Sequence, residues 1–378
     1  MNRQLAFSII VSLCLCSQLY AQELFDRGDA NGDGQVDISD PVFVLGFLFL
    51  GGTAPSCGDA ADANDDGNID ISDSVGLLRF LFMGSAAPPL PFGECGADST
   101  PGGPGCERFS PCEGEKPGIL PGARFLVDIT SARSVTLPTV VIAPKSPPTA
   151  AVILLEGDVG MINLGGTPED PEIESQGFLA RNADLFASGG LLVALVGAPS
   201  DYEEGIDLGY RVSAEQSEDV AAVIDWIDDR VSLPVWVLGM SLGSYSATNS
   251  AIRLNRSLDG YAVCSASTAP TGGPLAGGGI LLMPGFAEIA MPALVVGHAG
   301  DECPGTPSAG VALIAEALTG ASPIAQRVFT GGSPRPEASS CGPVSHHGYY
   351  GIEDEVVTYM ACIIASPAEG EDCVIGSP

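Results

Sequence analysis

Residues 233–243 read Leu-Pro-Val-Trp-Val-Leu-Gly-Met-Ser-Leu-Gly, an apolar run that ends in a Gly-x-Ser-x-Gly pattern. The run has the character of a strand that is buried on both faces. Residues 242–254, which follow it, carry apolar side chains at helical spacing. Ser241 is therefore predicted to lie on a tight turn between a strand and a helix, where glycines on both sides avoid steric collisions. A turn of that kind exposes the serine hydroxyl as a nucleophile.

Beyond residue 118 the chain alternates short apolar segments with longer amphipathic ones. Strands are expected at 124–129, 139–143, 151–155, 191–196, 235–238, 261–264, 293–296 and 326–329. From the third strand on, they alternate with expected helices at 178–187, 214–230, 242–254, 309–318 and 354–364. This alternation predicts an α/β fold, a mostly parallel sheet covered by helices on both faces. About 260 residues are enough for one large core.

An activated serine needs a base to take its proton and a third group to orient that base. Asp301 comes directly after an expected late strand, and His347 precedes the last expected helix. The chain order Ser241, Asp301, His347 is one of the known orders of a Ser-His-Asp triad. We therefore expect these three residues to form the catalytic group.

Each partner of the serine has an alternative nearby in the chain. His347 is preferred over His346 as the base because it is followed by Gly348, which lets a substrate approach. Glu302 is the alternative acid. His298 is expected to be a strand-end residue that is hydrogen-bonded near the acid, with no catalytic role.

Acyl transfer also needs two backbone N–H groups that stabilise the developing oxyanion. The first is expected from Leu242, directly after the nucleophile. The second is expected from the turn Glu-Gly-Asp-Val-Gly at 156–160, which follows the third strand. In that turn either Gly157 or Asp158 is the expected donor.

Residues 119–378 resemble the α/β-hydrolase superfamily, in particular its uncharacterised secreted or periplasmic members. The shared features are the segments 178–182, 212–215 and 347–357. The look-alikes usually carry Gly-Gly-x-Gly in the turn after the third strand, where this chain has Asp158 in place of the second glycine. The resemblance implies a serine hydrolase that acts on carboxylic esters through an acyl-enzyme and needs no catalytic cofactor.

Near the start of the chain, the segment 29–40 recurs 33 residues later as 62–73. Each copy has oxygen-bearing side chains at loop positions 1, 3, 5, 9 and 12 and a glycine at position 6, with a backbone carbonyl available at position 7. That arrangement suits Ca²⁺, which takes six to eight oxygen ligands. The expected ligand residues are Asp29, Asn31, Asp33, Gln35, Asp37 and Asp40, and Asp62, Asn64, Asp66, Asn68, Asp70 and Asp73. The sequence thus predicts two calcium ions, which we expect to be structural.

A single helix is expected after each loop, at 41–50 and 74–83, with Ser39 and Ser72 as N-caps. The duplicated loop and its exiting helices resemble a dockerin-like module over residues 25–84. Dockerins attach secreted enzymes to cohesin domains, often in polysaccharide-degrading assemblies. Loop positions 10 and 11 are Ile-Ser in both copies, where that family usually has a small polar pair. We therefore favour a structural or surface-attachment role over cohesin docking.

The expected domain order is a signal peptide at 1–21, the dockerin-like module at 22–84, a Pro/Gly/Cys-rich linker at 85–118 and the hydrolase-like domain at 119–378. The predicted location is therefore secreted, at the cell surface or periplasmic, where disulfides are permitted. Nine of the eleven cysteines lie beyond residue 21, so at least one remains unpaired. We expect pairs Cys303–Cys341 and Cys362–Cys373, one or two local disulfides in the linker, and a free Cys264.

The chain carries 15 Lys and Arg against 47 Asp and Glu, a net charge of −32. Such a surface repels phosphate, so nucleic acid and anionic membranes are poor candidate partners, and we expect no nucleic-acid partner. No segment after residue 21 is long and apolar enough to span a bilayer. The expected substrate is a small ester or an acylated glycan. Two alternatives stay open: a serine peptidase of the same fold, and a non-catalytic surface or assembly protein with an idle hydrolase domain.

Overall fold

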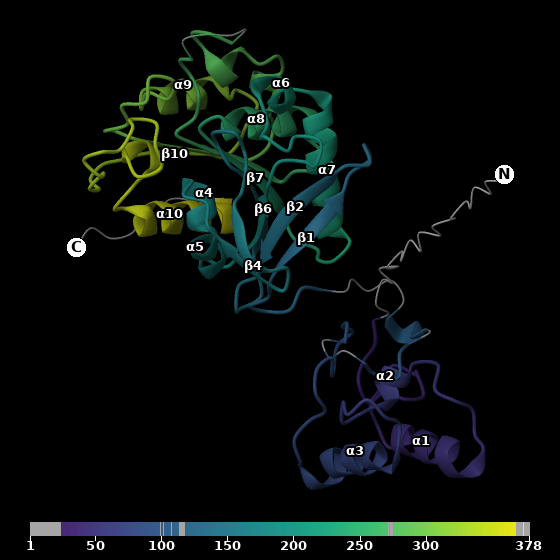
Figure 1. The fold of residues 1–378 in the computed structure, drawn as a ribbon. Coiled ribbons are helices and arrows are strands. Elements are labelled where there is room, and N and C mark those ends of the chain that lie inside the picture. The colour runs from purple at the N-terminus through teal and green to yellow at the C-terminus, as the bar shows by residue number, and fades with distance from the viewer. Residues whose placement is uncertain are drawn as a thin grey trace, which may run out of the picture. The chain divides into compact units, whose positions relative to one another are not determined.

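The computed structural model describes residues 24–98, 100, 102–106, 108–112, 118–270, 272, 275–367 and 373. The expected signal peptide at 1–21 lies outside these residues. The chain forms two compact units, Met1–Gly118 and Ile119–Pro378, each treated separately below (Figure 1). Over the residues described, none of the helices has the length and apolar character needed to cross a membrane.

An eight-stranded sheet forms the centre of the second unit, in the order β1-β2-β6-β3-β7-β8-β9-β10. Its strands are β1 (Arg124–Thr130), β2 (Thr136–Ile142), β3 (Ala150–Leu155), β6 (Leu191–Val196), β7 (Val235–Met240), β8 (Gly260–Cys264), β9 (Ala293–His298) and β10 (Ile324–Phe329). Strand β2 pairs antiparallel with β1 and β6, and the other pairs are parallel. The predicted mostly parallel sheet, with its eight strands, is confirmed.

Helices cover both faces of this sheet (Figure 1). One face packs against α7 (Ala214–Asp228), α8 (Gly243–Arg253) and α9 (Gly310–Ala317), the other against α4 (Phe178–Arg181), α5 (Ala183–Ser188) and α10 (Glu353–Ala365). Consecutive residues such as Val237 and Leu238 belong to different buried clusters. Successive strand side chains point to opposite faces, so a strand covered on both sides is apolar throughout.

Several short elements of the second unit lie in segments that the sequence pattern indicated as loops. They are the hairpin of β4 (Leu164–Thr167) and β5 (Asp170–Ile173), the helix α6 (Leu208–Arg211), and the 3₁₀ turns η2 (Gly279–Leu282), η3 (Phe286–Glu288) and η4 (His346–Gly348). Elements of three or four residues are too short to show a hydrophobic period. The helix expected at 178–187 is divided at Asn182, whose side-chain amide donates to the Phe178 carbonyl at 2.8 Å.

The first unit contains α1 (Ser39–Leu50), α2 (Gly58–Ala61), α3 (Ile71–Met83) and the 3₁₀ turn η1 (Ser110–Cys112). The N-caps expected at Ser39 and Ser72 are wrong, because both helices begin earlier than the apolar pattern suggested. The carboxylate of Asp70 instead accepts the Ser72 N–H, and that of Asp73 accepts the Asp70 N–H. Asp37 accepts the Ser39 N–H in the same way in the first copy.

The segment expected to be a linker, 85–118, packs back onto this unit over its described residues up to 112. Phe25 and Gly96 exchange backbone hydrogen bonds of 3.1 Å. Disulfides Cys57–Cys106 and Cys95–Cys112 join the segment to the module and to itself. Their sulfurs lie in a small buried cluster with Phe25 and Phe109. The first of these bridges spans 49 residues, so it is not the local link that composition indicated.

Candidate active site

Ser241 lies on the turn between β7 and α8 with φ of +52°, a left-handed conformation that non-glycine residues rarely adopt. A Cβ on Gly239 would lie 2.3 Å from the Gly243 carbonyl oxygen, and one on Gly243 would lie 2.1 Å from the Leu155 carbonyl oxygen. Neither glycine can therefore be replaced without moving backbone. The predicted strand-turn-helix around Ser241 is observed, with the strain that a nucleophile elbow stores.

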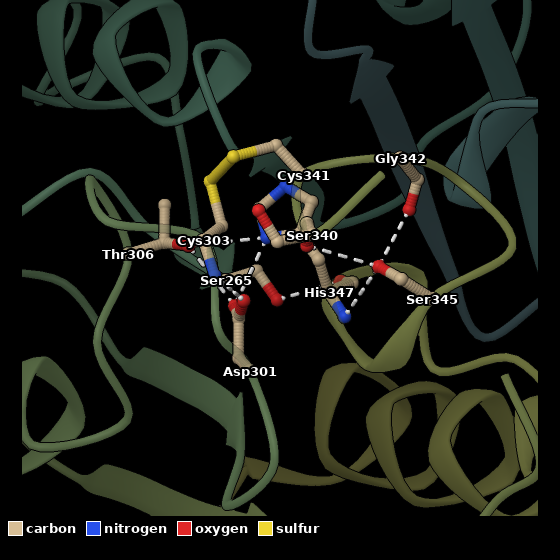
Figure 2. Close-up of a disulfide and its surroundings, with 9 residues drawn as sticks. All are labelled: Ser265, Asp301, Cys303, Thr306, Ser340, Cys341, Gly342, Ser345 and His347. Atoms are coloured by element: carbon tan, nitrogen blue, oxygen red, sulfur yellow. Dashed lines mark hydrogen bonds and ion pairs between the residues drawn. A yellow bond between two sulfur atoms is a disulfide. The ribbon is translucent and has the colours of Figure 1, made fainter. Parts of the chain in front are cut away.

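The expected acid and base lie together on two loops that follow β9 and β10 (Figure 2). Nδ1 of His347 is 2.9 Å from Oδ2 of Asp301, and the two side chains are 3 % and 0 % exposed. The other oxygen of Asp301 accepts the Cys303 N–H at 2.9 Å. Glu302, the alternative acid, is exposed to solvent. This pair can hold an imidazole in one tautomer, with Nε2 left to act on a proton.

The other two histidines hold the backbone just before the acid. Their rings stack with centroids 4.5 Å apart. His298 Nδ1 accepts the Gly300 N–H at 2.9 Å, and His346 Nδ1 donates to the Gly300 carbonyl at 3.1 Å. Burial, and next the neighbouring His346, lower the pKa of His298. His298 was expected to form a hydrogen bond near Asp301, and it does so with Gly300, the residue just before Asp301.

Thr306 joins the acid and the base, and sequence reasoning missed it. Its hydroxyl donates to Asp301 Oδ2 at 3.0 Å and lies 3.1 Å from His347 Nδ1. The side chain is buried. No sequence signal identifies it, because a threonine five residues after an aspartate is unremarkable until the loop is folded.

The loops of the acid and the base are also joined covalently. The expected disulfide Cys303–Cys341 is present, with a sequence separation of 38 between its cysteines (Figure 2). Ser345 then fixes the turn before the base, since its Oγ accepts the His347 N–H at 3.1 Å and donates to the Gly342 carbonyl at 2.8 Å. The other expected pair, Cys362–Cys373, and the buried free Cys264 are also observed.

The end of β8 connects the nucleophile to the base. The Cys264 carbonyl accepts the Ser241 N–H at 3.2 Å, and the hydroxyl of the next residue, Ser265, donates to the His347 carbonyl at 2.9 Å. In the described part of the chain the Ser241 hydroxyl makes no hydrogen bond to His347. Catalytic hydrogen bonds are often long before substrate binds, so this geometry is compatible with a base that acts on Ser241.

The turn at 156–160 lies directly against the nucleophile. A Cβ on Gly157 would be 3.0 Å from Cβ of Ser241. The Gly157 N–H donates to the buried carboxylate of Glu156 at 3.0 Å. Among the described residues, neither the Asp158 N–H nor the Leu242 N–H has an acceptor. Two of the three expected oxyanion donors are therefore available to a ligand.

The two loops of the first unit share most of their internal hydrogen bonds. Asp29 accepts the N–H groups of Gly32, Asp33 and Gly34, and Asp62 accepts those of Asp66 and Gly67. Asp40 accepts the Asn31 and Asp37 N–H groups, as Asp73 accepts those of Asn64 and Asp70. Each pair of acids thus organises its loop backbone in the same way.

The charges in these loops suit a cation. Burial, with the charges of Asp29 and Asp33 as a smaller cause, raises the pKa of Asp40 to about 6. Burial, with the charges of Asp62 and Asp66 as a smaller cause, likewise raises the pKa of Asp73 to about 6. In the described residues no three Asp, Glu, His or Cys side chains converge as a metal cage. The donor types nonetheless fit Ca²⁺, since they are hard oxygens and include amide and carbonyl groups.

Comparison with known families identifies the first unit. Residues 27–81 match the model described as dockerin type I domain. The chain carries a dockerin module. This match implies calcium binding by the dockerin module. A search among curated proteins finds no match to the chain.

Several solved structures are similar to this chain. One is an α/β serine hydrolase without a lid from Xanthomonas campestris, 14% identical, covering 69% of this chain and 99% of its own, with a TM-score of 0.42. A cold-adapted esterase from an Arctic intertidal metagenomic library is 16% identical over 63% and 92%, with a TM-score of 0.41. Dipeptidyl peptidase 4 of Porphyromonas gingivalis is 14% identical over 64% and 35%, with a TM-score of 0.42. The α/β-hydrolase fold of the unit behind the dockerin module is defined by its own sheet order and elbow.

Proposed function

We propose that the second unit is a serine hydrolase that cleaves carboxylic esters through an acyl-enzyme. The observation that carries the proposal is Ser241 in a left-handed turn, against a second turn whose Asp158 N–H is free to donate. The buried pair of Asp301 and His347, tied to the same strand end, supplies the base. A serine hydroxyl, a base, an orienting acid and two backbone donors are the groups that acyl transfer requires.

In the proposed reaction Ser241 Oγ attacks the acyl carbon while His347 Nε2 takes the hydroxyl proton. The carbonyl oxygen becomes an oxyanion that accepts the N–H groups of Leu242 and Asp158. Collapse of the tetrahedral species breaks the ester C–O bond, and the alcohol leaves with the proton from His347. Water then attacks the acyl-enzyme by the same steps. Asp301 keeps the Nδ1 proton of His347 in place throughout.

The experiment is to label the mature protein with a fluorophosphonate probe, beside Ser241→Ala and His347→Ala, and to assay p-nitrophenyl esters together with a peptide p-nitroanilide. We expect labelling and ester cleavage in the wild type and neither in the two variants. Cleavage of the anilide at a rate comparable to the esters would favour the peptidase alternative. A folded, calcium-loaded protein that is neither labelled nor active would overturn the proposal and favour a non-catalytic surface protein.

For the first unit we propose two structural calcium ions and an attachment role. Loop positions 10 of the two copies, Ile38 and Ile71, are 54% and 53% exposed, and Phe49 and Phe82 are 64% and 65% exposed at corresponding places 33 residues apart. Exposed apolar side chains repeated in this way favour a protein partner, cohesin-like or at the cell surface. The disulfides and the dockerin module support secretion of the protein. For an ester hydrolase that is attached to a dockerin module, we propose an acylated glycan as the substrate.

A further inference from the structure

Arg211, at the end of α6, is almost fully buried, with 1% of its surface exposed. Burial lowers its pKa to about 10, so the guanidinium remains charged at neutral pH. The charges of Glu156 and Asp158 act on it, but within the described residues no carboxylate forms an ion pair with it. Buried charges are costly unless they are paired, and a residue that only filled space here would need no charge.

The guanidinium is directed instead at the backbone of the turn beside Ser241. Nη1 donates to the Glu156 carbonyl at 3.2 Å, and Nη2 donates to the Gly157 and Asp158 carbonyls at 3.3 and 2.8 Å. Three consecutive carbonyl groups are thus held by one planar cation. The fork of Arg suits this arrangement, whereas Lys could present only a point charge.

In a trans peptide the N–H points opposite to the C=O. The Gly157 carbonyl accepts the Gly160 N–H of its own turn at 2.9 Å and Nη2 of Arg211 at 3.3 Å, so the Asp158 N–H of the same peptide points away from both donors. Asp158 is exposed and has a φ of +46°. Its N–H therefore faces the accessible side of a turn whose Gly157 lies against Ser241. A positive charge behind the peptide also strengthens the hydrogen bond that this N–H can donate.

Arg211 fixes the turn relative to the helix of the nucleophile as well. Its Nη1 lies 3.2 Å from the hydroxyl of Ser246 on α8. Helix α8 begins directly after Leu242, the other expected oxyanion donor. One side chain thus spans the two elements that carry the two donors.

From these contacts we infer that Arg211 is a positioning residue of the oxyanion hole, which sets the direction of the Asp158 N–H and its separation from the Leu242 N–H. The inference rests on the proposed ester hydrolysis. Arg211 touches no substrate in this scheme, and its effect is exerted on the transition state, where the oxyanion exists, and not on the bound ester.

The test compares Arg211→Gln and Arg211→Lys with Arg327→Gln as the control. Arg327 pairs with Glu355 and stacks on Phe329 and Tyr359, outside the site. For each protein kcat and KM are measured on the best p-nitrophenyl ester, and Ki for an alkyl trifluoromethyl ketone, whose adduct with Ser241 carries an oxyanion. Thermal unfolding is recorded in parallel.

Loss of a single oxyanion donor typically costs about 10²-fold or more in kcat, so Arg211→Gln is expected to lose about 10²-fold with KM little changed. Its Ki for the ketone should rise by the same factor. Arg211→Lys, which keeps the charge and most of the volume, should lose less and carries the test if the Gln variant does not fold. Arg327→Gln should retain wild-type kcat and Ki whatever its unfolding temperature.

Unchanged kcat in a folded Arg211 variant, or a fall in kcat without a matching rise in Ki, would overturn the inference while leaving the proposed hydrolase intact. A wild-type protein that hydrolyses no ester would overturn the proposed function and, with it, the role of Arg211.

Discussion

Oδ2 of Asp301 lies 2.9 Å from Nδ1 of His347, although 46 residues separate the two in the chain. The two loops that carry them are closed by the Cys303–Cys341 disulfide, and Thr306 contacts both side chains. Both side chains are almost completely buried, so their interaction is little weakened by solvent. The disulfide and Thr306 therefore hold the two side chains together, in addition to the direct hydrogen bond between them.

Asp301→Asn should lower kcat by about 10³- to 10⁴-fold with little change in fold, because an amide cannot hold the imidazole in the required tautomer. The measurement is steady-state hydrolysis of the ester found in the labelling experiment. Glu302→Gln is the matched control, since this neighbouring acid is exposed, and it should keep wild-type kcat. If kcat fell in Glu302→Gln and not in Asp301→Asn, Glu302 would be the acid that orients His347.

Asp158→Gly should retain kcat within about twofold and raise stability by up to about 1 kcal/mol, because glycine accepts the φ of +46° without strain and keeps the backbone N–H. Gly157→Ala is the contrasting variant. Its Cβ would lie 3.0 Å from Cβ of Ser241 and 3.1 Å from the Met240 carbonyl oxygen, so it should lose most activity. Activity lost in Asp158→Gly would instead assign a role to the Asp158 carboxylate.

Removing the Cys303–Cys341 disulfide, with both cysteines changed to serine, should destabilise the second unit by about 4 kcal/mol in the chain-entropy model. Removing Cys362–Cys373, which closes only 11 residues, should cost about 3 kcal/mol. Chemical denaturation measures both. Below the unfolding transition, only the first double variant should also lose ester hydrolysis, because only that bridge joins the acid and base loops. Equal activity in the two would indicate that hydrogen bonds alone hold the loops.

Calcium removal should act on the dockerin module and not on the proposed active site. In EGTA the unfolding temperature of the module should fall by several degrees, since bound ions stabilise only the folded state. Asp29→Ala together with Asp62→Ala should abolish the response to added calcium, whereas Glu94→Gln, an exposed acid outside the loops, should preserve it. Titration calorimetry should find two ions. A module whose unfolding is insensitive to EGTA would contradict their structural role.

The stability of the second unit should depend on the protonation of His298. Burial lowers its pKa in the folded state, so between that pKa and the ordinary 6.5 the unfolded chain binds the extra proton. The stability contributed by the neutral ring is therefore complete above about pH 6.5 and is lost as pH falls below it. His298→Asn, which keeps an acceptor for the Gly300 N–H, should show a smaller fall in stability between about pH 7.5 and about pH 5. The measured quantity is the difference between the two proteins in this fall, and an equal fall would contradict the prediction.

Much of the fold could be predicted because its signals are local. A strand buried on both faces is apolar almost throughout, and β3, β6, β7, β8 and β9 carry that signature along their whole length. The edge strands at 124–130 and 324–329 are only partly buried and include charged residues, so their signal is weaker. The two glycines around Ser241 were also a usable sequence signal, because only glycine fits at these positions. A Cβ at either one would lie 2.3 Å or less from a backbone oxygen. The two calcium-type loops were identified by their repeat, and the family match to residues 27–81 agrees with that identification.

The sequence alone thus indicated the eight strands of the large sheet, its longer helices, the elbow, the loop repeat and the pairing of Cys303 with Cys341. Only the tertiary structure decided that residues 85–112 pack onto the first unit, that Thr306 joins the acid to the base, and that Arg211 holds the turn at 156–158. These depend on contacts between segments up to tens of residues apart, and a lone threonine or arginine carries no period or motif. The groups that Thr306 and Arg211 contact come close to them only in the folded chain. Every residue has a backbone carbonyl, so the sequence does not show which carbonyls will point toward Arg211.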